Sequence, residues 1–122
     1  MYYVQYAHAR IASIFKTAAE RGVTADGAQV QLLAAPGERE LIRLLQKLPE
    51  LLDDVAQHRG VHLLTVYALE LAGAFHGFYR DHRVVDDANP ALSKARLRLM
   101  QAVQLTLRQT LRLLGVNAPE SM

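Results

Sequence analysis

The chain has 122 residues, of which 51% are hydrophobic and 21% are charged, and its formal net charge at pH 7 is only +2. This length and composition fit one ordered globular domain with a single core, and so small a charge does not by itself indicate a nucleic-acid-binding protein. There is no cysteine, no signal-peptide pattern and no uninterrupted run of about 18 apolar residues, which predicts a cytoplasmic protein without disulfides, thiolate metal sites or a membrane partner.

Apolar residues recur at helical spacing along nearly the whole chain, and no segment alternates as a β-strand would. The first expected helix runs from about Tyr2 to Arg21 and stops at Gly22, and residues 23–35 follow as a turn and linker. Four further helices are expected at about Glu38–Lys47, Pro49–Arg59, Val61–Arg80 and Pro90–Leu114. The sequence therefore predicts an all-α bundle of about five helices in a single domain spanning residues 1–122.

The first helix has two distinct faces at about 100° per residue. The side expected in the core carries Val4, His8, Ile11 and Phe15, and we interpret His8 as a hydrogen-bonded structural histidine. Roughly opposite lie Tyr3, Tyr6, Arg10 and Ser13. Two tyrosines beside an arginine could stack on unpaired RNA bases. Alternatively, Tyr6 and Arg10 form a local cation–π pair, or the tyrosines pack against a neighbouring domain.

The middle of the chain shows no recognisable chemical site. Glu50, Asp53 and Asp54 have only His58 at ligand spacing, and two ligands do not hold a metal ion. A glycine-rich phosphate loop and the residue sets of nucleophilic catalysis are also absent. We therefore predict no metal site and no catalytic residue.

The helix expected over 61–80 is mostly apolar, as a central and well-buried helix would be. His76 lies about a quarter-turn from its core stripe, near Gly73 and Gly77, where another backbone or a nucleotide could come close. A lone histidine near an apolar face is more often structural. The end of this helix is nevertheless aromatic and basic, with Tyr79, Arg80, His82 and Arg83.

The last helix carries the clearest charge pattern, because its basic residues are not accompanied by any acidic one: Lys94, Arg96, Arg98, Arg108 and Arg112. All except Arg96 fall within about 40° of one line along the helix, and Arg96 lies on the apolar side. Such a stripe could track a phosphate backbone. Alternatively, it is a solvated face whose positive charge suits the C-terminal end of the helix dipole.

Three blocks in this order resemble the C-terminal anticodon-binding (DALR) domain of arginyl-tRNA synthetases. Residues 3–11 (YVQYAHARI) resemble the helix that joins the catalytic body to this domain, and residues 69–79 (LELAGAFHGFY) resemble its central helix. Residues 95–99, 113–116 and 118–122 (ARLRL, LLGV and APESM) resemble its last helix and tail. The Asp-Ala-Leu-Arg string that named the domain does not occur, and residues 23–57 are poorly diagnostic.

The resemblance implies that the chain grips the anticodon stem-loop of the arginine tRNA. Carried over by position, the implied contacts are Tyr3, Tyr6, Arg10, His76, Tyr79, Arg80, Arg83 and the terminal Met122, to which the stripe of the last helix adds Lys94 and Arg98. The two nucleotide-binding motifs of the family, a His-Ile-Gly-His type turn and a Lys-Met-Ser-Lys type loop, are missing. We therefore expect a C-terminal fragment that binds no cofactor and is inactive alone, whose parent attaches arginine to its tRNA with ATP and magnesium.

The sequence leaves two alternatives open. The tyrosine face and the basic stripe could dock a protein surface, such as the catalytic body of the parent, without an RNA role. The chain could also be the equivalent helical domain of another class I synthetase, although its opening block and terminal residues fit the arginine family best.

Overall fold

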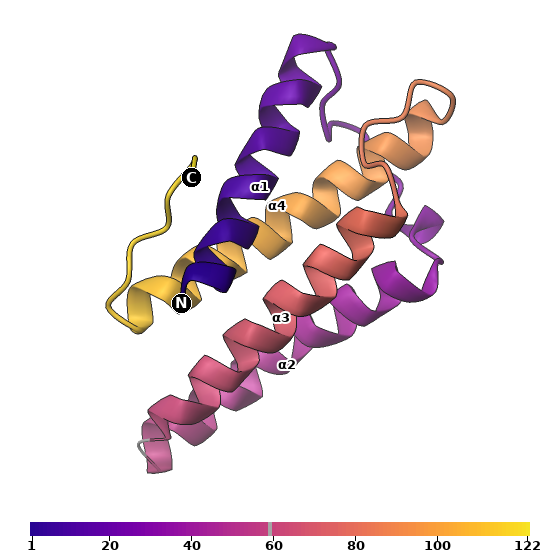
Figure 1. Cartoon of the computed structure of the whole chain (residues 1–122). Helices are drawn as coiled ribbons and strands as arrows, with labels where there is room; N and C mark the ends of the chain where they lie inside the picture. Colours follow the sequence, from indigo (N-terminus) through magenta and orange to yellow (C-terminus); the bar gives the residue numbers. More distant parts are fainter. Residues whose placement is uncertain (59) are drawn as a thin grey trace.

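The computed structural model describes residues 1–58 and 60–122 of the chain (Figure 1). Its elements in chain order are α1 (Tyr2–Glu20), a short 3-10 helix η1 (Val30–Leu32), α2 (Pro36–His58), α3 (Val61–Asp81) and α4 (Pro90–Leu113). The described residues contain no strand. The predicted all-α bundle is therefore confirmed, and the ends of its first and last helices lie within one residue of their expected positions.

The two helices expected over 38–47 and 49–59 are a single helix, α2, with Pro49 in its interior. The expected end of the second of them, at Arg59, lies outside the described residues. Proline lacks the N–H that would bond to the fourth carbonyl before it, and this costs a helix about 3 kcal/mol. Burying one leucine fully contributes about 1.5–3 kcal/mol. Apolar residues continue past Pro49 at helical spacing, with Leu41 and Leu44 buried before it and Leu51 half-buried after it, so tertiary packing keeps the helix intact.

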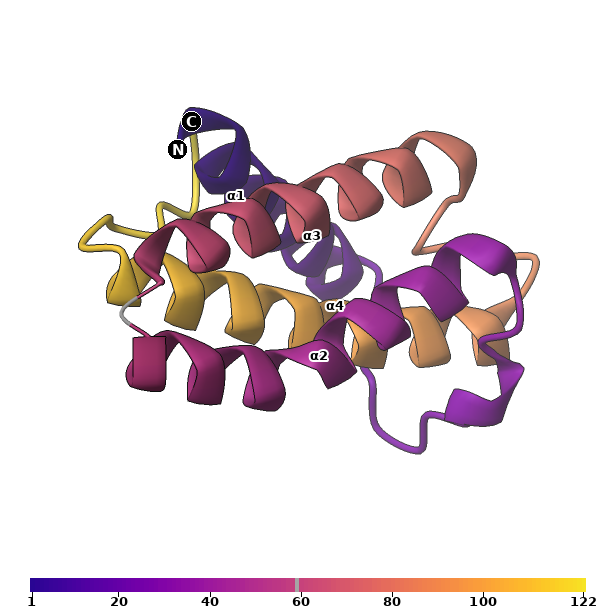
Figure 2. The same ribbon diagram turned by 90° about the horizontal axis from the view of Figure 1, so that it is seen from below.

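The core lies where α3 packs against the other three long helices (Figure 2). Helices α2 and α3 lie side by side, and α4 contacts α1, α2 and α3. By length and composition alone α3 could cross a membrane, since its mean hydropathy is 1.2 over an 18-residue window of which 39% is buried. Its place in the bundle accounts for this composition. The largest fully buried side chains include Ile11, Leu41, Leu71, Phe75, Leu97, Met100 and Leu107.

Arg96 lies on the apolar side of α4 because it has a partner there. Its Nε donates to Glu38 Oε2 at 2.7 Å, and the Glu38 and Arg96 side chains are only 1% and 10% exposed. Two further N–H groups of Arg96 donate to the Arg83 carbonyl at 3.1 Å and to His82 Nδ1 at 3.3 Å. The other Glu38 oxygen accepts from the Ala35 N–H at 3.0 Å. One buried ion pair thus joins the start of α2, the first half of α4 and the loop that follows α3.

The C-terminal tail, residues 115–122, turns back along α1 (Figure 1). Gly115 follows α4 with a φ of 76°, a left-handed conformation that suits glycine, as predicted. The next N–H, from Val116, donates to the Leu111 carbonyl at 2.9 Å and so closes the helix end. The tail then bonds to the first turns of α1, through Gln5 to Asn117 and through His8 to Pro119.

Candidate nucleic-acid interface

Five side chains from α1 and α3 lie together with the guanidinium of Arg10 at their centre, and we call this group the aromatic cluster: Tyr3, Tyr6, Arg10, His76 and Tyr79. The Cζ of Arg10 lies 4.7 Å from the ring centroid of Tyr6 and 4.3 Å from that of Tyr79. Its Nη2 donates to the Tyr6 hydroxyl at 3.0 Å. The cation is therefore held by two aromatic rings, each of which attracts it through the negative face of its quadrupole.

His76 completes the cluster as a neutral imidazole. Arg10 can only donate, so Nδ1 of His76 accepts from Arg10 Nη1 at 3.2 Å. The proton then belongs on Nε2, which donates to the Tyr3 carbonyl at 3.3 Å. Burial lowers the pKa of His76, and the neighbouring Arg10 charge lowers this pKa further against the opposing effect of the Tyr3 carbonyl. His76 therefore has a structural role, as one interpretation of the sequence expected. Its two hydrogen bonds hold Arg10 and the Tyr3 backbone together in the cluster.

The geometry of the cluster leaves aromatic surface and donors available to a ligand. The ring centroid of Tyr3 lies 4.7 Å from that of His76, yet Tyr3 and Tyr79 remain 47% and 40% exposed. Only two of the five N–H groups of Arg10 are engaged among the described residues. The cation–π pair of Tyr6 and Arg10, which the sequence offered as an alternative to base stacking, is present. Arg10 makes a second contact of this kind with Tyr79. Such a group can stack unpaired bases and still offer positive charge to phosphate.

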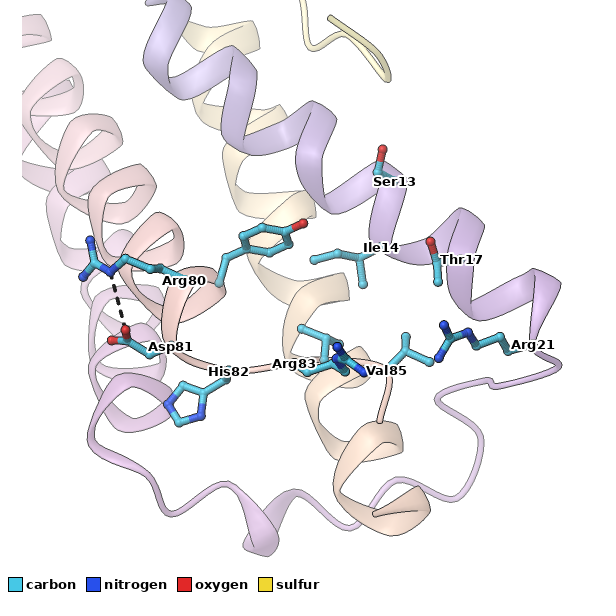
Figure 3. A pocket seen from close by; sticks show the side chains of 11 residues that line it. Ser13, Ile14, Thr17, Arg21, Arg80, Asp81, His82, Arg83 and Val85 are labelled. Carbon is cyan, nitrogen blue, oxygen red and sulfur yellow. Dashed lines mark hydrogen bonds and ion pairs between the residues drawn. The ribbon is translucent and has the colours of Figure 1, made fainter. Parts of the chain in front are cut away.

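A cavity of about 540 Å³ adjoins the cluster, between the second half of α1 and the end of α3 (Figure 3). We call it the basic groove because three arginines line it. Its lining residues include Ser13, Thr17, Arg21, Tyr79, Arg80 and Arg83. Figure 3 shows Arg83 beside Val85, while Arg80 turns outward to Asp81 at 3.4 Å. Arg21 makes an exposed ion pair with Asp87 at 3.6 Å. Tyr79 belongs to both features, so the groove continues the surface of the cluster.

The structure brings seven of the ten expected contact residues onto this one surface. Five form the aromatic cluster, and Arg80 and Arg83 line the basic groove. Lys94 and Arg98 line neither feature, and each is about 160–200° around α4 from Arg96, whose side chain donates to the Arg83 carbonyl in the loop after α3. Met122 ends the tail on the other flank of α1 and is 53% exposed. Lys94 and Arg98 thus belong to neither the cluster nor the groove, and their contact with RNA stays a prediction.

Sequence reasoning missed two parts of the structure around α1. Arg21 and Thr17 line the groove, and helical period alone places both within about 40° of Arg10 on α1, so this signal was available. The second part is the tail contact of His8, whose imidazole is fully buried as the structural interpretation predicted. No local pattern could have paired His8 with Pro119, because the two residues are 111 positions apart in sequence.

Known proteins resemble the chain along its whole length. The family model of the DALR anticodon binding domain matches residues 4–122. A protein named arginine–tRNA ligase from Citrifermentans bemidjiense is 47% identical over 124 residues, covering 100% of this chain and 22% of that protein. Another of that name, from Dehalococcoides mccartyi, is 48% identical over 122 residues with the same coverage. The arginyl-tRNA synthetase structure from Thermus thermophilus superposes with a TM-score of 0.81 at 38% identity, covering 98% of this chain and 21% of that one.

Proposed function

Because the chain belongs to the DALR anticodon binding domain family, we propose that it binds the anticodon stem-loop of an arginine tRNA through the aromatic cluster and the basic groove. One observation carries the proposal: Arg10 is fixed between two tyrosine rings at the edge of a groove that holds three more arginines. Tyrosine faces suit the unpaired bases of a loop, and arginines suit its phosphates.

The cluster and the groove contribute to binding in different ways. Stacking of a base on an aromatic side chain is worth about 1–3 kcal/mol and tolerates any base. Phosphate contacts by Arg21, Arg80 and Arg83 release counterions, so they make binding depend on salt. With about three to five such contacts, log affinity should fall with log salt at a slope of about −2 to −4.

The test is a titration of a fluorescently labelled arginine-tRNA anticodon stem-loop at several salt concentrations. The Arg83→Gln variant should weaken binding and reduce the magnitude of the salt slope by about 0.7–0.9, as expected for one lost phosphate contact. Arg98→Gln removes the same charge from a position of α4 that lines neither the cluster nor the groove, and it serves as the matched control. An absence of binding at low salt, a flat salt response, or equal effects of the two substitutions would contradict the proposal.

We also propose that this chain acts as part of a longer enzyme in the cytoplasm that attaches arginine to its tRNA with ATP and magnesium. The chain spans about a fifth of the length of the ligases it matches, at 22% of each. Exposed apolar residues on α3, namely Val61, Val66 and Leu69, would suit contact with the catalytic body of such an enzyme. The chain alone should not catalyse arginine-dependent pyrophosphate exchange with ATP, and any such activity would refute this division of labour.

A further inference from the structure

One wall of the basic groove is a short segment, residues 82–85, with few hydrogen bonds of its own. Helix α3 ends where the His82 N–H donates to the Phe78 carbonyl at 2.9 Å, and the segment then runs along the groove (Figure 3). Among the described residues, no backbone–backbone hydrogen bond involves residues 83–85. Val84 and Val85 are buried and anchor the segment by packing, whereas Arg83 is exposed. Packing of the valines thus leaves the Arg83 peptide group without a backbone partner.

Arg96 supplies this partner from the interior of the bundle. Its Nη1 donates to the Arg83 carbonyl at 3.1 Å, the one hydrogen bond that the backbone of residues 83–85 makes among the described residues. Its Nη2 donates to His82 Nδ1 at 3.3 Å, and its Cζ lies 5.7 Å from the ring centroid of Phe78. A guanidinium holds its donors in one rigid plane. A single side chain therefore fixes the direction in which the segment leaves α3.

The ion pair of Arg96 with Glu38 is not explained by stability alone. Both side chains are buried, and replacing a buried pair by apolar residues is often neutral or stabilising, because taking two charges out of water is costly. Glu38 is itself held in place, since its second oxygen accepts from the Ala35 N–H. The carboxylate therefore orients the guanidinium of Arg96, and the guanidinium orients the segment that carries Arg83.

From this arrangement we infer that Arg96 is a positioning residue of the RNA-binding surface: oriented by Glu38, it fixes the Arg83 backbone and so holds the Arg83 guanidinium at the groove for an RNA phosphate. The inference rests on the proposed function. Arg96 touches no RNA in this role, and Glu38 cancels its charge. It keeps residues 82–85 ordered before binding, so that RNA does not have to order them on arrival.

Removing the buried pair as a unit separates positioning from folding. Glu38→Gln with Arg96→Met leaves no unpaired charge in the core and does not change the net charge of the chain. The new glutamine oxygen can still accept from the Ala35 N–H. Measured without RNA by nitrogen-15 relaxation, the backbone order parameters of residues 82–85 should fall from about 0.85 towards about 0.6, while circular dichroism shows a folded domain.

The same double variant should bind the anticodon stem-loop about fivefold more weakly, the factor expected when one exposed ionic contact is lost. Its salt slope should decrease in magnitude by about 0.7–0.9, as for Arg83→Gln. Adding Arg83→Gln to the double variant should cause no further loss, because the contact of Arg83 is already gone. Fully additive losses would overturn the inference, as would unchanged affinity and order parameters in a folded double variant.

The exposed pair of the same helix provides the control. Glu40→Gln with Arg43→Met removes an ion pair that lines neither the cluster nor the groove, so it should change neither binding nor the order parameters. An equal loss in this control would overturn the inference.

A conservative variant covers the case in which the double variant does not fold. Arg96→Lys keeps a cation for Glu38 but lacks the planar fork that also reaches the Arg83 carbonyl, so it should show the same loss of binding and of order. Binding by Arg96→Lys equal to that of the original chain would overturn the role of Arg96. If the original chain binds no stem-loop, the proposed function fails, while the order parameters still decide whether Arg96 fixes the segment.

Discussion

Replacing Glu38 by glutamine should destabilise the domain strongly, because it leaves the charge of Arg96 buried without a counterion. Breaking a buried pair in this way typically costs about 3–5 kcal/mol. A domain of 122 residues has a total stability of roughly 6–18 kcal/mol at about 0.05–0.15 kcal/mol per residue. One substitution at a buried position that is not itself a proposed ligand contact should therefore remove a large part of the free energy of unfolding.

The same helix offers a matched control. Glu40 pairs with Arg43 at 2.6 Å, but their side chains are 45% and 54% exposed. Water and salt screen such a pair, so Glu40→Gln should change the stability little. Urea unfolding followed by circular dichroism measures both variants under identical conditions.

A double variant tests whether the unpaired charge of Arg96 causes the loss of stability. Glu38→Gln with Arg96→Met removes the unpaired charge and should be more stable than Glu38→Gln alone. Because Arg96 also bonds to the Arg83 carbonyl, the single variant should loosen the loop that carries Arg83 and weaken stem-loop binding at a temperature where the domain is still folded. A double variant that is less stable than Glu38→Gln would refute the reasoning, as would equal costs for Glu38→Gln and Glu40→Gln.

Three further predictions concern the aromatic cluster. Arg10→Lys should weaken stem-loop binding about tenfold or more in a fluorescence titration while leaving the melting temperature nearly unchanged, because lysine cannot stack as a plane between Tyr6 and Tyr79 while donating to two partners. Gly73→Ala should stabilise the domain by about 0.5–1 kcal/mol in urea unfolding without reducing binding, because a Cβ there would meet the Tyr3 hydroxyl at an ordinary 3.7 Å. The pKa of His76 is lowered in the folded state, so its contribution to stability is present above the unfolded pKa of about 6.5 and is lost as the pH falls below it. The difference in melting temperature between the original chain and His76→Gln should therefore shrink from pH 8 to pH 5, and a constant difference would contradict the neutral state assigned to His76.

The fold could be predicted from the sequence where its signals are local. Gly22 and Gly115 adopt positive φ at helix ends, and Pro90 begins α4, because these residues act on the backbone next to them. Pro49 carries the same kind of local signal and misled the prediction. Its effect competes with leucines that are buried against α3, and burial of this kind is decided by tertiary contacts.

The candidate site likewise has a part that local sequence signals predicted and a part that depends on tertiary packing. Helical period grouped Tyr3, Tyr6 and Arg10 on α1, but only the packing of α1 on α3 brings Arg10 to His76, which is 66 positions away in sequence. The helical period also predicted the basic stripe of α4. It could not predict which way the stripe faces, because that direction depends on how the helices cross. Arg96 was an anomaly in sequence, and its partner Glu38 is 58 residues away.

The basic residues of the proposed interface are kept available in two different ways. Arg21 and Arg80 sit in exposed ion pairs with Asp87 and Asp81, and such pairs are worth so little that an incoming phosphate can displace the carboxylate at small cost. Arg10 is held by aromatic rings, a hydroxyl and a neutral imidazole, none of which cancels its charge. The rim of the groove can therefore adjust to a phosphate backbone and make binding depend on salt. The cluster presents one fixed cation between stacking surfaces, so the position at which a base is held should be determined by α1 and α3 and not by the ionic strength.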